Sequence, residues 1–243
     1  VATPIPAQSV VQDGSLNFTV PAGTFTDPDV GDTLTLSATL ANGSPLPSWI
    51  TFNPTTGTFS GTPGNADVGN LSIRVTATDG SNASVHTDFS LTITNVNDAP
   101  VVATPIPAQS IAQNSSLSFT VPSGTFTDPD VGDTLTLSAT LADGSPLPSW
   151  ITFNAATGTF SGTPGNADVG SLSIRVTATD GSNASVHTDF SLTVTNVNDA
   201  PVVATPIPAQ SVVQDGSLNF TVPAGTFTDP DVGDTLTLCA TLA

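Results

Sequence analysis

A near-identical internal repeat constrains this chain more than any other feature of its sequence. The opening segment VATPIP, residues 1–6, returns at residues 102–107 and again at residues 203–208. The period is therefore 101 residues (102 − 1), the size of one β-sandwich domain. We expect a tandem array with repeat 1 at 1–100, repeat 2 at 101–201 and the first strands of a partial repeat 3 at 202–243.

Apolar and polar residues alternate with a period of two within each copy. In residues 71–78 the apolar side chains occupy the odd positions, and segments 16–20, 33–40 and 85–95 alternate in the same way. This spacing predicts half-buried strands with a Thr/Ser-rich outer face. Turn residues separate the runs at short intervals and no run has helical spacing. We therefore expect an all-β fold of tandem immunoglobulin-like Greek-key β-sandwiches, with about seven strands per repeat and essentially no α-helix.

The charge of the chain excludes several classes of partner. Twenty acidic residues, every one of them Asp, face two basic residues, Arg74 and Arg175. Nothing in such a chain could neutralise the phosphates of a nucleic acid, and a bare anionic membrane would repel it. No apolar run approaches the roughly 20 residues that span a bilayer, so we expect no membrane insertion.

An acidic loop recurs with the repeat. Residues 25–32 read FTDPDVGD and return unchanged at 126–133 and 227–234, which places carboxylates at i, i+2 and i+5. Such carboxylates repel one another unless a cation neutralises them, and Ca²⁺ is the hard cation that most often takes oxygen ligands of this kind. The alternative is that Asp-Pro-Asp is an ordinary turn sequence. The last acid of each loop, Asp32, Asp133 or Asp234, is interpreted as a turn cap rather than a ligand.

Four motifs carry a resemblance to a known family. Residues 46–63 (LPSWITFNPTTGTFSGTP) resemble the signature of bacterial dystroglycan-type cadherin-like domains, also described as immunoglobulin-like repeats. Residues 27–29 (DPD), 77–80 (ATDG) and 95–100 (NVNDAP) resemble the calcium-binding segments of cadherin repeats. The resemblance implies a cadherin-like β-sandwich with Ca²⁺ at the domain junctions. Cadherin repeats also use Glu ligands, and this chain has no Glu, so one or two ions per junction are expected.

The resemblance also implies which oxygens meet at each junction: those of the linker, the next acidic loop and a strand end. At the first junction the implied ligands are Asn97, Asp98, Asp128, Asp130 and Asp180. At the second junction they are Asn198, Asp199, Asp229 and Asp231, and a weaker or empty site before repeat 1 has Asp27, Asp29 and Asp79. With the ion the array is expected to be a rod, and without it the Asn-Asp-Ala-Pro linker acts as a hinge.

The inventory of reactive residues argues against an enzyme. The only histidines, His86 and His187, are expected to be surface strand residues, and no nucleophile motif, phosphate loop or His/Cys metal cluster is present. Trp49 and Trp150, one per complete repeat, are expected to anchor the core, with a sugar-stacking platform as the alternative.

Residues 203–243 supply only the first strands of a sandwich and leave Leu218, Phe220, Leu236 and Leu238 uncovered. Either the natural chain continues, or a neighbouring chain completes the fragment by strand donation. Cys239 replaces the Ser found in the other copies; it is interpreted as a small-residue substitution, with an intermolecular disulfide as the alternative.

These features favour a non-enzymatic, calcium-stiffened structural or adhesive repeat module of a large bacterial surface adhesin or extracellular fibre. The expected partners are neighbouring repeats or like chains, and the expected location is extracellular or at the cell surface. The alternative is a carbohydrate- or matrix-binding module appended to a secreted enzyme, with an extracellular glycan as its partner.

Overall fold

A computed structural model describes residues 1–29, 31–231 and 233–242. Val30 and Val232, in two of the acidic loops, and Ala243, at the end of the expected repeat 3, lie outside the described residues. The chain divides into two compact units, Val1–Ala99 with Asp128–Thr134 and Pro100–Thr127 with Leu135–Ala243. Residues 128–133 of the acidic loop of repeat 2 are therefore grouped with the first unit.

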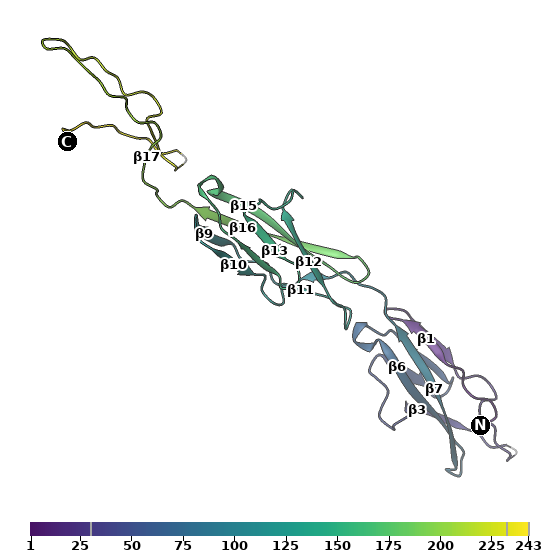
Figure 1. Ribbon diagram of the computed structural model, residues 1–243. Coiled ribbons are helices and arrows are strands. Elements are labelled where there is room, and N and C mark those ends of the chain that lie inside the picture. Colours follow the sequence, from purple (N-terminus) through teal and green to yellow (C-terminus); the bar gives the residue numbers. More distant parts are fainter. Residues whose placement is uncertain (30, 232, 243) are drawn as a thin grey trace. The chain divides into compact units, whose positions relative to one another are not determined.

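The first unit contains a four-stranded and a three-stranded sheet (Figure 1). The first sheet has the order β1-β7-β6-β3, with β1 Gln8–Val11, β3 Thr35–Leu40, β6 Gly69–Thr78 and β7 Ser84–Thr94. The second has the order β2-β5-β4, with β2 Leu16–Thr19, β4 Ile50–Asn53 and β5 Thr58–Gly61. Only β1 and β7 pair in parallel among these strands. The architecture confirms the predicted all-β sandwich.

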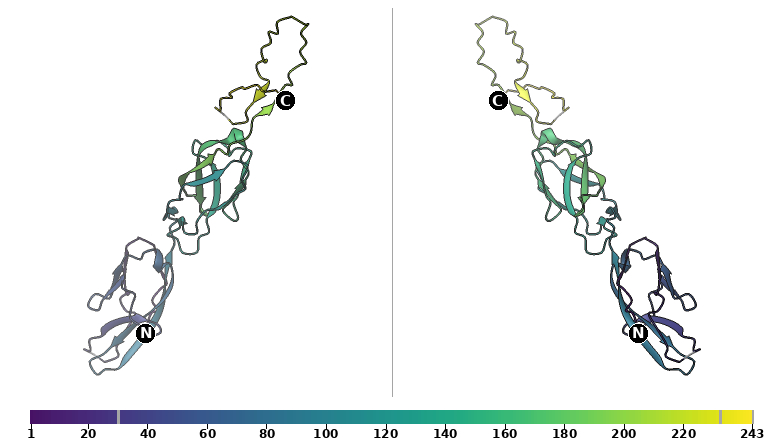
Figure 2. Two further views of the ribbon diagram at one scale, coloured as in Figure 1. Left: turned by 90° about the vertical axis from the view of Figure 1, so that its left-hand side faces the viewer. Right: turned by 90° about the vertical axis from the view of Figure 1, so that its right-hand side faces the viewer.

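The second unit repeats this arrangement, and Figure 2 gives two further views of its strands. One sheet has the order β12-β15-β16-β9, with β9 Gln109–Ala112, β12 Thr136–Leu141, β15 Gly170–Thr179 and β16 Ser185–Thr195. The other has the order β10-β14-β13, with β10 Leu117–Thr120, β13 Ile151–Asn154 and β14 Thr159–Gly162. A short pair joins β8 Val101–Val102 to β11 Phe126–Thr127.

Helical structure in the described part of the chain is limited to two 3-10 turns, η1 Asn65–Asp67 and η2 Asn166–Asp168. Each turn lies between two strands, β5 and β6 in the first unit and β14 and β15 in the second. Asp67 tightens the first one, because its Oδ2 accepts the backbone N–H of Gly64 at 2.9 Å. No helix among these residues is long and apolar enough to cross a membrane.

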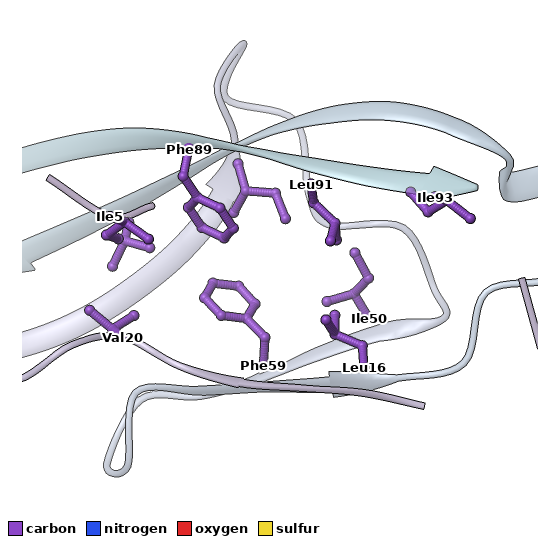
Figure 3. Packing of buried hydrophobic residues seen from close by; sticks show 10 residues of the cluster. Ile5, Leu16, Val20, Ile50, Phe59, Phe89, Leu91 and Ile93 are labelled. Carbon is purple, nitrogen blue, oxygen red and sulfur yellow. The ribbon is translucent and has the colours of Figure 1, made fainter. Parts of the chain in front are cut away.

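Each core is built around a buried phenylalanine, Phe59 in the first repeat (Figure 3). Its ring centroid lies 4.6 Å from that of Phe52 and 5.6 Å from that of Phe89. In β6, Ile73 and Val75 are fully buried while the polar residues between them are not, so the predicted alternation is confirmed. Aromatic pairs of this kind add to the burial of apolar area that holds the two sheets together.

A close approach of two strands fixes a glycine beside the tryptophan of each repeat. A Cβ atom at Gly61 would lie 1.9 Å from the backbone oxygen of Trp49, and one at Gly162 would lie 2.0 Å from that of Trp150. Both Trp side chains pack against the core clusters, as expected for core anchors. The sugar-stacking alternative gains no support from this packing.

The third copy forms less structure than its sequence identity suggests. Its strands are β17 Val202–Val203 and β18 Phe227–Thr228, which pair with each other. In the described residues of this copy, the counterparts of β1, β2 and β3 are not strands. Leu218 is 60% exposed whereas its counterpart Leu16 is 6% exposed. In repeat 1, residues such as Phe59 cover Leu16, and residues 203–242 contain no equivalent of them.

Candidate metal centre

The acidic loop of repeat 2 brings three carboxylates together. Asp128, Asp130 and Asp133 each offer an oxygen, and these oxygens lie within 4.8 Å of one another. The backbone folds the loop in this way because the Asp130 N–H donates to Asp128 Oδ1 at 2.9 Å and the Asp133 N–H donates to the Asp130 carbonyl at 3.3 Å. Gly132, at φ +97°, allows the left-handed turn between them.

Asp130 is the most informative member of this cluster. It is only 3% exposed, and its Oδ1 is buried without a hydrogen-bond partner among the described residues. Asp128 Oδ2 is in the same situation. A buried acceptor without a donor is costly, and more so when it is charged. The two oxygens are therefore candidates for contact with a cation.

The linker after repeat 1 contacts this loop. The backbone N–H of Asp98 donates to Asp130 Oδ2 at 2.8 Å, and the Asn97 side-chain amide donates to the Asp98 carbonyl at 3.0 Å. Asp98, Asp128 and Asp130 thus come together within the first unit. Asp180 belongs to the second unit, where its Oδ1 accepts the backbone N–H groups of Ser182 and Ala184 at 2.8 Å each.

The second linker and the third acidic loop repeat this geometry inside the second unit. Asp229, Asp231 and Asp234 place oxygens within 4.8 Å of one another. The backbone N–H of Asp199 donates to Asp231 Oδ2 at 2.7 Å. Asp231 is 3% exposed, and its Oδ1 is also buried without a partner in the described part of the chain. Asn198 donates its side-chain N–H to the Asp199 carbonyl at 3.0 Å.

The cluster at the start of the chain differs in membership from the prediction. Asp27, Asp32 and Asp79 offer oxygens within 4.8 Å of one another, and Asp29 is not part of that described group. The Asp29 N–H instead donates to Asp27 Oδ1 at 2.9 Å. The last acid of each loop, which sequence reasoning interpreted as a cap, lies in the cluster in all three copies. Asp79 also accepts N–H groups from Ser81 and Ala83, as its counterpart Asp180 does.

Neither basic side chain of the protein is available to these loops. The Arg74 guanidinium donates to both oxygens of Asp88 at 2.7 and 2.8 Å, and Arg175 donates to both oxygens of Asp189 at 2.8 and 2.9 Å. The hydrogen bonds from Arg74 lower the pKa of Asp88, and those from Arg175 lower the pKa of Asp189. Since the chain holds no other Arg and no Lys, no guanidinium or side-chain ammonium group is left to neutralise the clusters.

Sequence reasoning missed a pair of amide side chains at each linker. Gln12 and Asn65 both donate to Asp98 Oδ2 at 3.0 Å, and Gln113 and Asn166 both donate to Asp199 Oδ2 at 2.9 Å. Gln12 is 3% exposed although it follows an alternating strand. The sequence signal that could have indicated this role is the recurrence of Gln, as Gln113 in repeat 2, just before a turn.

The donor set suits a hard cation. The clustered side chains are carboxylates, with carbonyls and amides of the linker beside them, and Ca²⁺ takes six to eight oxygens of these kinds at about 2.3–2.6 Å. Soft ligands are absent from the clusters, and the buried oxygens without donors are available for coordination. The residues present therefore fit Ca²⁺.

Comparison with known proteins places the chain in a family. A model of the family described as "Putative Ig domain" matches residues 1–94 and 99–195. The curated protein "Serine-rich adhesin for platelets" of Staphylococcus aureus (strain MRSA252) is 32% identical over 160 residues, which is 66% of this chain and 11% of the adhesin. The adhesin of strain USA300 matches at the same identity over 6% of its length. The chain thus spans a small part of these relatives.

Solved structures of cadherin repeats share the fold. The crystal structure of human CDH23 EC21-23 matches with a TM-score of 0.61 and 17% identity over 95% of this chain and 85% of that one. Mouse Cadherin-23 EC22-24 matches with a TM-score of 0.53 and 20% identity over 84% and 68%. At these identities the likeness concerns the fold alone.

Proposed function

The chain belongs to this family of Ig-like domains, and from that membership and the acidic clusters we propose a non-enzymatic repeat module, stiffened by Ca²⁺, in an extracellular adhesive protein. The observation that carries the proposal is the buried Asp130, whose Oδ1 has no donor among the described residues. It lies among three carboxylates in a chain whose two arginines are both engaged elsewhere. An external cation satisfies both the charge and the missing contact.

The proposed ligands at the first junction are Asp128, Asp130 and Asp133 of the loop, joined by Asn97 and Asp98 of the linker and by Asp180. This assignment is supported by the contact between Asp98 and Asp130. Support for Asp180 comes from its counterpart Asp79, which lies with Asp27 and Asp32. We expect one or two ions at this junction.

The other two sites follow the same pattern. At the second junction the proposed ligands are Asn198, Asp199, Asp229 and Asp231, with Asp234. Before repeat 1 the proposed ligands are Asp27, Asp79 and Asp32, together with Asp29 of the same loop.

The ion would supply the positive charge that oxygen ligands bind, and the residues of the chain hold the linker in place. Linker and loop already touch through one backbone hydrogen bond. When the carboxylates of the loop are neutralised, their repulsion no longer opposes this contact, and the linker is held. Without neutralisation the Asn-Asp-Ala-Pro linker is proposed to act as a hinge.

An adhesive role outside the cell is supported by the likeness to the staphylococcal adhesin. The proposed partners are neighbouring repeats or like chains. The closer assignment to dystroglycan-type cadherin-like repeats, the domain limits 1–100, 101–201 and 202–243, and a place in a bacterial surface protein or filament are parts of the same proposal.

Chelation tests the proposal directly. The full chain is compared in Ca²⁺, in Mg²⁺ and in EDTA by thermal unfolding and small-angle scattering. At a hundred times Kd, Ca²⁺ stabilises by about 2.7 kcal/mol per site, so EDTA is expected to lower the Tm and to broaden the distribution of chain dimensions. Mg²⁺, which demands a tighter octahedral site, is expected to substitute poorly. Identical Tm and scattering in Ca²⁺ and EDTA would refute the metal assignment.

A further inference from the structure

Side-chain amide groups hold the linker carboxylate after each complete repeat, and the proposed metal sites do not include them. Asp98 Oδ2 accepts two hydrogen bonds at 3.0 Å, one from Gln12 Nε2 and one from Asn65 Nδ2. The two donors are 86 and 33 residues away in the chain, and they come from the end of β1 and from η1. We call Gln12 and Asn65, with their counterparts Gln113 and Asn166, the amide clamp.

The clamp is fixed to the sandwich at its base. The backbone N–H of Gln12 donates to the Thr94 carbonyl at 3.0 Å, at the last residue of β7 and just before the linker. Gln12 is 3% exposed, so its side chain cannot swing away without leaving a hole. The carboxylate it holds is therefore positioned relative to the sheet rather than to solvent.

The same arrangement recurs in repeat 2. Gln113 and Asn166 both donate to Asp199 Oδ2 at 2.9 Å, and Gln113 is 2% exposed. Gln113 Nε2 also donates to the Val197 carbonyl at 3.0 Å and contacts Asn166 Oδ1. The side chain thus holds both the backbone and the carboxylate of the linker.

Neutral N–H donors suit this task in a chain with a net charge of −18. Hydrogen bonds to a charged acceptor are stronger than those between neutral groups, so two amides can hold a carboxylate without a cation. A Glu at the position of Gln12 would offer only acceptors and would need an ion to approach Asp98. With the carboxylate held, the backbone N–H of Asp98 is presented to Asp130 Oδ2 at 2.8 Å.

We propose that Gln12 and Asn65, and likewise Gln113 and Asn166, are positioning residues that dock the linker on the preceding sandwich independently of any cation. The linker up to Asp98 is thereby oriented before an ion arrives, and the hinge proposed for the calcium-free chain is confined to the residues after Asp98. The ion then has to order the acidic loop against a linker that is already oriented. This last consequence rests on the proposed calcium site, whereas the docking itself does not.

Hydrogen exchange of the full chain in EDTA tests the docking. Asn65→Asp and Gln12→Glu keep the shape of each side chain and replace its donor by an acceptor. Gln8→Glu is the matched control, because Gln8 begins the strand that Gln12 directly follows, its replacement makes the same charge change, and it donates only to the Pro6 carbonyl among the bonds described. The linker peptide 93–102 starts with Ile93 whereas its counterpart starts with Val194, so mass spectrometry distinguishes the two linkers.

In EDTA, the exchange rate of the Asp98 amide is expected to rise about tenfold or more in Asn65→Asp and Gln12→Glu, as for the loss of one charge-assisted hydrogen bond. It is expected to be unchanged in Gln8→Glu, and amides of β6 should stay protected in all variants that fold. If Gln12→Glu unfolds repeat 1, the half-buried Asn65 decides the matter. Wild-type exchange of Asp98 in folded Asn65→Asp would overturn the proposal. Calorimetric Ca²⁺ titration of the unmutated chain tests the metal site separately, since its failure leaves the exchange result standing.

Discussion

The charge on Asp130 should stabilise the chain with calcium and destabilise it without. Asp130→Asn keeps the shape of the side chain and its ability to accept the Asp98 N–H through the remaining oxygen. It removes one of three negative charges whose oxygens lie within 4.8 Å of one another. Two unit charges at that distance repel by about 1 kcal/mol in water and about 3 kcal/mol at an effective dielectric constant of 20.

Because Asp133 is exposed and Asp128 is half-buried, solvent screens part of this repulsion. In EDTA we therefore expect Asp130→Asn to raise the free energy of unfolding by about 1 kcal/mol. At calcium concentrations a hundred times Kd, the wild-type chain gains about 2.7 kcal/mol that the variant forgoes. The order of stability should then reverse, with the variant less stable by about 1–2 kcal/mol.

Urea unfolding followed by tryptophan fluorescence measures this reversal, since each complete repeat carries one Trp. Asp143→Asn is the matched control: it removes a charge from the same repeat, at an exposed turn where repeat 1 already has Asn42. Both side chains accept a backbone N–H there, from Ser145 and from Ser44. The reasoning would be wrong if Asp130→Asn were the less stable chain in EDTA, or if it kept the full calcium response.

Two further predictions concern the sandwiches themselves. Gly61→Ala should destabilise repeat 1 by about 3 kcal/mol in urea unfolding, because its Cβ would lie 1.9 Å from the Trp49 backbone oxygen. Gly23→Ala, with φ +83° and nothing within 4 Å of the added Cβ, should cost only about 1 kcal/mol. Equal costs for the two variants would contradict the steric argument. Arg74 lowers the pKa of Asp88, so the ion pair should contribute stability above about pH 4 and lose it as the pH falls further. At pH 7 the wild type is expected to unfold at a higher urea concentration than Asp88→Asn, and this difference in midpoint should vanish in acid. A difference that persists at low pH would contradict the expected direction of the pH dependence.

The alternation of apolar and polar residues predicted the sandwich because every second side chain of these strands faces the core. The positions of Ile73 and Val75 could be read from the odd numbering of apolar residues in their segment, and both are fully buried. The grouping of Asp128 with Asp130 could be read from their spacing in one loop. These features are local, and local sequence determines them.

The amide clamp could not be predicted in that way, since it depends on contacts across 86 and 33 residues between neutral side chains. A buried Gln at the end of a strand has no periodic signature, and its partner Asn65 looks like any loop residue. The membership of Asp133 in the acidic cluster was missed for a different reason: its backbone does form the expected turn, and its side chain nevertheless lies with the other acids. The two roles are not exclusive.

The third copy shows that the contact between linker and acidic loop forms without a complete sandwich after it. There, residues equivalent to three strands of repeat 1 are not strands in the described part, yet β17 and β18 pair and Asp199 donates to Asp231 as Asp98 does to Asp130. The acidic loop therefore takes its shape from the preceding linker and from a two-residue strand pair, without the core of its own repeat. The grouping of residues 128–134 with the first unit points the same way. Each acidic loop is then a structural extension of the repeat before it, and the hydrogen bond from Asp98 to Asp130 should persist in variants that disrupt the core of repeat 2, as hydrogen exchange of the Asp98 amide would show.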